Sequence, residues 1–168
     1  MATYTFTGAN GDPLPAGLTA QNGTFEIQNN KLEATSPNPG GPLWVCTQPS
    51  TADGNTVATI NLEGTASNTT GVVFRYSNND NFWMAVINGL SGQLVLFDRT
   101  AGTFTNRGSY TIPSFSASTD YVINAIYSGT SIDIELDSVS RITLTDSFNQ
   151  TETLAGLRFG KKVTPLMN

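Results

Sequence analysis

The stretch from Gly71 to Asp98 carries the clearest alternation of hydrophobic and polar positions in the chain. Residues 72–77 repeat with a period of two, which is typical of a strand with one face on a core. Residues 82–87 are apolar at almost every position, which indicates a central strand covered on both sides. Residues 93–98 form a third run, and clusters of polar turn residues separate the three. We therefore predict an antiparallel three-stranded meander at the centre of a sheet.

Similar short runs recur along the rest of the chain at intervals of roughly ten residues, the spacing of a β-sandwich or barrel. Asn29 and Asn30 lie between two of the runs and predict a hairpin with positive φ at one or both positions. The segment 36–42 holds three prolines and two glycines and is expected to be irregular. The further predicted strands are 3–7, 24–28, 32–35, 43–47, 56–62, 104–112, 121–127, 131–136, 140–145 and 155–160.

Composition agrees with an all-β chain and excludes several functions. The 168 residues suit one domain, which we place at 1–160 with a polar tail at 161–168. Only 12% of residues are charged and the formal net charge is −5, which argues against nucleic-acid binding. No run approaches the ~18 apolar residues of a membrane-spanning helix. The first residues lack the basic and apolar regions of a signal peptide, so we expect either assembly inside a cell or a signal that was removed by cloning.

Histidine is absent from the chain, which removes the serine and cysteine hydrolase triads and the usual zinc sites. Cys46 is the only cysteine, so no intramolecular disulfide can form. It lies in an apolar run with Trp44, and we expect both side chains in the core. We predict that the protein is not an enzyme.

Several motifs together resemble a known family. Gly71–Tyr76, followed after a polar turn by Asn81–Val86, resembles the central strands of concanavalin A-like lectin and glucanase sandwiches, particularly their laminin-G-like and sugar-binding branches. Thr119–Asn124 and Ala155–Gly160 follow the order of later strands in those domains. The opening, Phe6–Gly11, looks like the start of such domains in bacteriophage structural proteins. The resemblance implies an all-β, antiparallel two-sheet sandwich of the jelly-roll type, a fold that hosts lectins, hydrolases and structural modules.

The acidic residues do not reproduce the glucanase branch's catalytic strand, in which Glu, Asp and Glu follow one another at near-alternate positions. The closest pattern is Asp133, Glu135 and Asp137, whose spacing of two puts all three on one strand face. We interpret that face as solvated, because nothing apolar surrounds the carboxylates. A calcium site would need further oxygen ligands from a loop such as Asn78–Asn81, so no cofactor or metal is assigned.

Arg75 and Trp83 are the candidate glycan-binding residues. Arg75 alternates with Phe74 and Tyr76, so its side chain is expected on the opposite face of the strand. If Trp83 shares that face, the arginine and the indole could stack on a sugar ring and donate to its hydroxyl groups. The other interpretation is that Arg75 pairs with a carboxylate or with carbonyl groups inside the fold.

Two functions follow from these observations. The first is a non-catalytic structural component of a phage virion, such as a capsid decoration protein, a head fibre or a tail accessory protein. Its expected partners are the major capsid or other virion proteins and further copies of itself, and its expected location is the virion, assembled in the host cytoplasm. The alternative is a carbohydrate-binding module for a cell-surface or extracellular glycan.

Overall fold

Thirteen β-strands make up the regular structure of the computed structural model, which describes residues 4–36 and 44–159. No helix in that part of the chain is long and apolar enough to cross a membrane. The tail at 161–168, most of the segment 36–42 and the side chain of Trp44 lie outside the described residues. The strands are β1 (Thr19–Asn22), β2 (Thr24–Gln28), β3 (Lys31–Ser36), β4 (Trp44–Pro49), β5 (Gly54–Ile60), β6 (Thr69–Asn78), β7 (Asn81–Asn88), β8 (Gln93–Thr100), β9 (Thr103–Thr111), β10 (Tyr121–Ser128), β11 (Ser131–Leu136), β12 (Val139–Thr145) and β13 (Leu154–Phe159).

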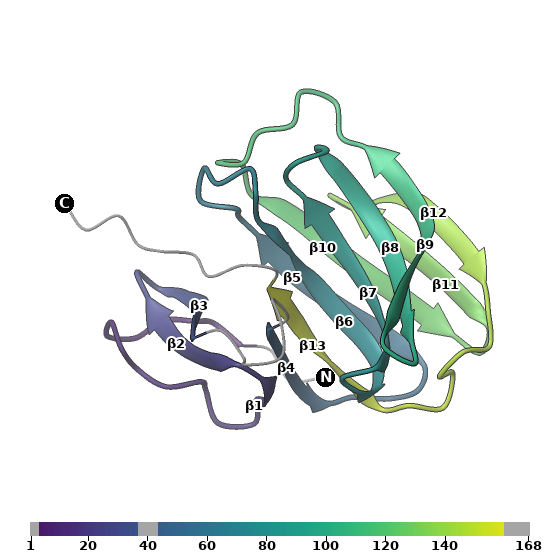
Figure 1. The fold of residues 1–168 in the computed structure, drawn as a ribbon, viewed down its shortest axis with the longest axis horizontal. Coiled ribbons are helices and arrows are strands. Elements are labelled where there is room, and N and C mark those ends of the chain that lie inside the picture. Colours follow the sequence, from purple (N-terminus) through teal and green to yellow (C-terminus); the bar gives the residue numbers. More distant parts are fainter. Residues whose placement is uncertain (1–3, 37–43, 160–168) are drawn as a thin grey trace.

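The strands form a sandwich of two antiparallel sheets with a separate hairpin. The larger sheet has seven strands in the order β1-β4-β13-β6-β7-β8-β9, and the smaller has four in the order β12-β11-β10-β5. Figure 1 shows the smaller sheet overlapping the larger one, with the hairpin β2–β3 to one side, beside β1 and β4. The main hydrophobic core lies between the two sheets. The predicted all-β sandwich is therefore confirmed.

The predicted meander is the centre of the larger sheet. Strands β6, β7 and β8 pair antiparallel in sequence order, with Ala85 opposite both Val72 and Leu96. Alternate residues of these strands belong to two different buried clusters, one between the sheets and one on the other face. This two-sided burial explains why residues 82–87 are apolar without alternation.

The hairpin β2–β3 extends the second layer. Asn29 and Asn30 have φ values of 52° and 59°, so both occupy the left-handed region, as predicted. Phe25 and Ile27 of the hairpin pack with Cys46 and Phe159 of the larger sheet in one buried cluster. Leu157 contacts this cluster and the main core, so the hairpin covers the same face of the larger sheet as β5 does.

Two expectations about strands were wrong. Residues 4–7 of the predicted opening strand form no ladder, although Tyr4 and Phe6 are the half-buried positions of that segment. An alternating pattern gives an extended conformation, but a strand also needs a partner in register. Strand β1 was missed, because its sequence, TAQN, contains little apolar pattern to detect.

Candidate functional site

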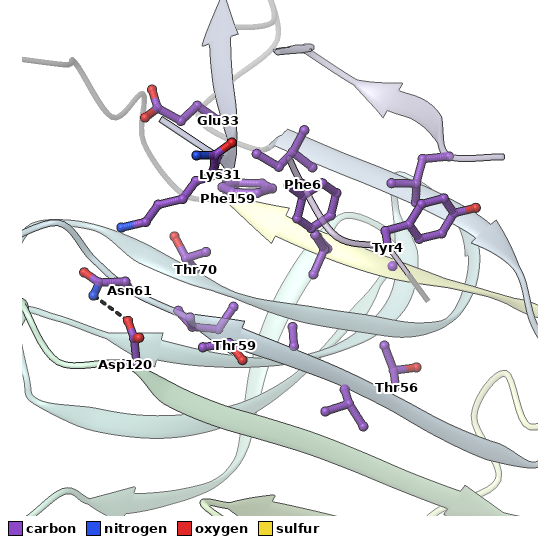
Figure 2. A pocket seen from close by; sticks show the side chains of 18 of the residues that line it. Tyr4, Phe6, Lys31, Glu33, Thr56, Thr59, Asn61, Thr70, Asp120 and Phe159 are labelled. Atoms are coloured by element: carbon purple, nitrogen blue, oxygen red, sulfur yellow. Dashed lines mark hydrogen bonds between the residues drawn. The ribbon is translucent and has the colours of Figure 1, made fainter. Parts of the chain in front are cut away.

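A groove with a volume of about 670 Å³ lies between the hairpin β2–β3 and strand β5 (Figure 2). Strand β5 and Asn61 form one wall, and residues 30–33 of the hairpin form the opposite one. Phe159 and its neighbours on β13 contribute the floor. Tyr4 and Phe6 line the groove from the N-terminal segment, and Figure 2 shows them on the side of Phe159, across from Thr56 and Thr59 of β5. We call this feature the β3–β5 groove.

The two walls are strand edges that have no partner among the described residues. Strand β5 pairs only with β10, and β3 pairs only with β2. Consecutive residues from Asn55 to Asn61 line the groove, so the edge of β5 rather than one of its faces borders it. An unpaired edge presents backbone N–H and C=O groups. The groove therefore offers backbone donors and acceptors in addition to its side chains.

One end of the groove is polar. Asn61 Nδ2 donates a hydrogen bond of 2.6 Å to Asp120 Oδ1, and Asn61 Oδ1 accepts one of 2.8 Å from the Glu63 backbone N–H. Lys31 forms an ion pair with Glu63. Figure 2 shows the Lys31 side chain extending toward the end where Asn61 and Asp120 meet. An amide, two carboxylates and an ammonium group thus gather at one place.

The rest of the groove is more apolar. The rings of Tyr4 and Phe6 lie nearly parallel, with centroids 6.5 Å apart and planes inclined by 11°, and both are partly exposed. Phe159 is buried and packs against Phe25 with ring centroids 5.7 Å apart. Thr59 and Thr70 add hydroxyl-bearing side chains. The groove combines partly exposed aromatic rings with hydrogen-bonding groups.

Glu33 stands out among the charged residues of the groove. Its side chain is buried, with 8% of its surface exposed, and it makes no hydrogen bond or ion pair with the described residues. Burial raises the pKa of the Glu33 carboxyl, and the negative charges of Glu63 and Glu26 raise it further, while Lys31 lowers it. The electrostatic environment at this wall is therefore negative.

The structure places the predicted site residue Arg75 in the interior. Its side chain is fully buried and donates a hydrogen bond of 2.6 Å from Nη2 to the Gly129 carbonyl. Its guanidinium carbon lies 5.4 Å from the ring centroid of Tyr127, and its Nη2 lies 4.0 Å from Asp53 Oδ1. Burial lowers the pKa of Arg75, and the negative charge of Asp53 partly opposes this effect. These contacts match the second interpretation of Arg75, a partner inside the fold.

Arg75 does not face away from Phe74, as its position in the sequence had suggested. Phe74 pairs with Trp83 and Asn78 with Asn81, so the chain of β6 contains extra residues between these pairs. Arg75 lies in this bulge with φ 47°, and both Arg75 and Phe74 contact Tyr127 of the smaller sheet. A bulge interrupts the period of two, which is why simple alternation failed here.

Trp83 is also fully buried in the main core. Its ring stacks on Phe74 with centroids 6.3 Å apart, and its Nε1 donates a hydrogen bond of 2.9 Å to the Phe148 carbonyl. Neither Trp83 nor Arg75 has surface that a glycan could reach in this conformation. A glycan would therefore have to bind elsewhere on the domain.

The acidic residues of β11 occupy separate environments. Asp133 accepts a hydrogen bond from Ser140 and Glu135 accepts one from Asn124, while Asp137 lies in the turn after β11 with φ 52°. Only two of the three carboxylates therefore share the strand face that the spacing predicted. Among residues 4–36 and 44–159, no group of three histidine, cysteine or acidic residues is arranged to hold a metal ion.

Solved structures that share the fold of this chain include a carbohydrate-binding module, a glucanase and a galectin. The carbohydrate-binding module CBM66 from Bacillus subtilis superposes with a TM-score of 0.71 and 19% identity, over 87% of this chain and 93% of the module. A prokaryotic β-1,3-1,4-glucanase (lichenase) from a mouse hindgut metagenome gives 0.65 and 9%, over 96% and 88%. Sheep galectin-11 gives 0.53 and 11%, over 75% and 95%.

These similarities establish the fold as a concanavalin A-like β-sandwich, as the sequence motifs had implied. No family model and no curated protein sequence matches the chain. The similarities to the module, the glucanase and the galectin do not show the phage connection expected from the opening residues.

Proposed function

We propose that this domain binds a glycan in the β3–β5 groove and acts as a non-catalytic carbohydrate-binding module. The observation that carries the proposal is the combination of partly exposed Tyr4 and Phe6 rings with the hydrogen-bonded Asn61–Asp120 pair in one open groove. Sugar rings present apolar C–H faces that pack on aromatic side chains. Their hydroxyl groups both donate and accept hydrogen bonds, which amides and carboxylates can reciprocate.

The structural neighbours support this choice at the level of function class. The names of the neighbours are those of a carbohydrate-binding module, galectins and glucanases, so each concerns carbohydrate. They do not support the virion role that the sequence had suggested first. Location in a virion and association into a homo-oligomer remain predictions, and recovery of the protein in purified particles at a fixed stoichiometry would test the first.

The carboxylates of the groove favour binding over hydrolysis. A glycosidase needs two carboxyl groups flanking the scissile bond, ~5 Å apart in retaining enzymes and wider in inverting ones. Glu63 is held in an ion pair with Lys31, and Asp120 accepts a hydrogen bond from Asn61. Glu63 and Asp120 are thus each engaged in a contact that positions them as hydrogen-bond acceptors, so we assign these two residues to recognition. Glu33 is the remaining carboxyl group of the described lining, and one unpaired carboxyl group is fewer than the two that hydrolysis requires.

The decisive experiment measures retention of the protein on a glycan array, followed by titration calorimetry with the strongest ligand. Tyr4→Ala removes an aromatic contact with the sugar, and Asp120→Asn removes a charged hydrogen-bond acceptor. Each variant should weaken binding about tenfold or more, because each loss is worth about 1.5–3 kcal/mol. Matched controls are Tyr110→Ala and Asp133→Asn, whose side chains lie on β9 and β11 away from the groove.

Three results would contradict the proposal. The first is an array with no signal for the parent protein. The second is binding that the controls weaken as much as the groove variants do. The third is loss of binding in Phe104→Ala, because Phe104 is 42% exposed and packs with Phe82 and Phe97 on the other face of the larger sheet. Release of shorter sugars from the ligand would indicate an enzyme instead.

A further inference from the structure

We infer that the β3–β5 groove selects its glycan by charge: it favours saccharides with free amino groups, accepts neutral ones and excludes those with carboxylate or sulfate groups. This inference rests on the proposed function and adds the chemical class of the ligand.

The charges of the lining are unbalanced. The charged side chains that residues 4–36 and 44–159 contribute are Lys31, Glu33, Glu63 and Asp120, one cation against three anions, which gives this part of the lining a formal charge of −2. Lys31, the one cation among them, is already paired with Glu63. An acidic sugar entering the groove would find no unpaired positive charge in this lining. It would either separate the Lys31–Glu63 pair or lie beside like charges.

The surroundings of Glu33 agree with this charge balance. Burial makes the largest contribution to the raised pKa of its carboxyl, Glu63 and Glu26 raise it further, and the opposing effect of Lys31 is the smallest contribution. The buried Glu33 side chain has no hydrogen-bond or ion-pair partner among the described residues. A cationic group bound nearby would offset the charge of Glu33, whereas an anionic group would add to the repulsion.

Asp120 is the contact that an amino sugar could make at the polar end. Its side chain is exposed, and only Oδ1 is used, as the acceptor for Asn61. The other oxygen accepts no hydrogen bond within the described residues and remains open to a ligand. Hydrogen bonds between charged groups are roughly twice as strong as neutral ones, so an ammonium group here gains more than a hydroxyl group does.

The test uses an array with three sets of probes: neutral oligosaccharides such as cello- and fructo-oligosaccharides, deacetylated chito-oligosaccharides, and acidic glycans such as oligogalacturonates and sulfated galactans. Binding is read at low and at physiological salt, with the amines protonated. We expect signals on neutral and amine-bearing probes, at least tenfold tighter binding to the latter at low salt, and a smaller difference at higher salt because ions screen exposed charges.

Variants assign the preference to the groove. Asp120→Asn should weaken binding of the amine-bearing probes more than binding of the neutral probes, so that most of the amine advantage is lost, and Asp133→Asn should leave the ranking unchanged. Thermal unfolding of each variant confirms that it is folded.

Two outcomes overturn the inference alone: acidic probes that bind as tightly as neutral ones, or an amine preference that survives Asp120→Asn. Binding to none of the three sets overturns the inference together with the proposed function, so the two failures can be told apart.

Discussion

Replacement of Arg158 by methionine tests whether a buried charge costs this fold stability. Arg158 lies on β13, opposite Val45 and Gly71, and its Nη1 donates a hydrogen bond of 2.8 Å to the Thr69 carbonyl. Its Nε is buried without a hydrogen-bond partner, and none of the four ion pairs of the described residues includes it. Methionine retains a long unbranched side chain and removes the charge.

The expected change follows from two opposing effects. Burial lowers the pKa of Arg158 from 12.5 to about 10, and a difference of this size corresponds to about 3 kcal/mol against the charged form in the folded state. This value is an upper limit, since the side chain keeps some exposed surface. The variant also loses a charged hydrogen bond worth about 1.5–3 kcal/mol. Arg158→Met should therefore raise the free energy of unfolding by about 0–1.5 kcal/mol.

Urea denaturation at pH 8 measures this difference, and a series up to pH 10.5 tests its cause. The folded-state pKa lies below the unfolded one, so above pH 10 the unfolded chain holds the proton more tightly than the folded chain does. The stability of the parent relative to Arg158→Met should therefore improve as the pH rises through 10. Arg141→Met, on the exposed β12 residue that lies over Tyr110, is the control and should destabilise slightly.

A loss of more than about 1.5 kcal/mol in Arg158→Met would refute this reasoning, because the arginine would then contribute more than its one hydrogen bond. A difference that does not change between pH 8 and 10.5 would also contradict it. Comparing the two proteins at each pH removes the effect of other groups that titrate in alkali, such as Tyr76, whose pKa burial raises to about 12.

Three further experiments test the packing and the turns. Gly156→Ala should destabilise by about 1–3 kcal/mol in urea denaturation, since a Cβ would lie 2.0 Å from the Cys46 carbonyl oxygen; a change below 0.5 kcal/mol would contradict the geometry. Burial raises the pKa of the Cys46 thiol to about 12, so a thiol reagent at pH 8 should label it only as the protein unfolds, and stability should fall in alkali as the unfolded thiol ionises first. Ala101→Asn, at φ 47° before Gly102, should stabilise the β8–β9 turn by about 0.5–1 kcal/mol in thermal unfolding, whereas destabilisation would argue against that turn.

The open groove follows from the way the second layer is built. The smaller sheet ends at β5 and the hairpin β2–β3 packs separately on the larger sheet, so two strand edges face each other without joining. A continuous sheet would close this space through backbone hydrogen bonds. The space is therefore available for a ligand because the pairing is incomplete.

The local sequence pattern correctly predicted the features that depend on residues adjacent in the sequence. The meander, the Asn29–Asn30 turn and the buried thiol of Cys46 were all predicted correctly. Strand alternation, turn geometry and burial of an apolar run depend on a few adjacent residues. The motifs of Gly71–Tyr76 also led to the correct fold, because the central strands of this sandwich are its most strongly patterned part.

The tertiary structure alone decided which residues meet. Asn61 and Asp120 are 59 positions apart, and Lys31 and Glu63 are 32 apart, yet each pair forms one contact at the same end of the groove. Nothing in the local sequence of these residues indicates a partner, since strand order and unpaired edges are properties of the assembled sheets. The bulge at Arg75 is a similar case: the sequence alternates through it, but the backbone does not, and the arginine points into the core. The amino-acid sequence thus specified the sandwich, and the packing of its layers determined where a ligand can bind.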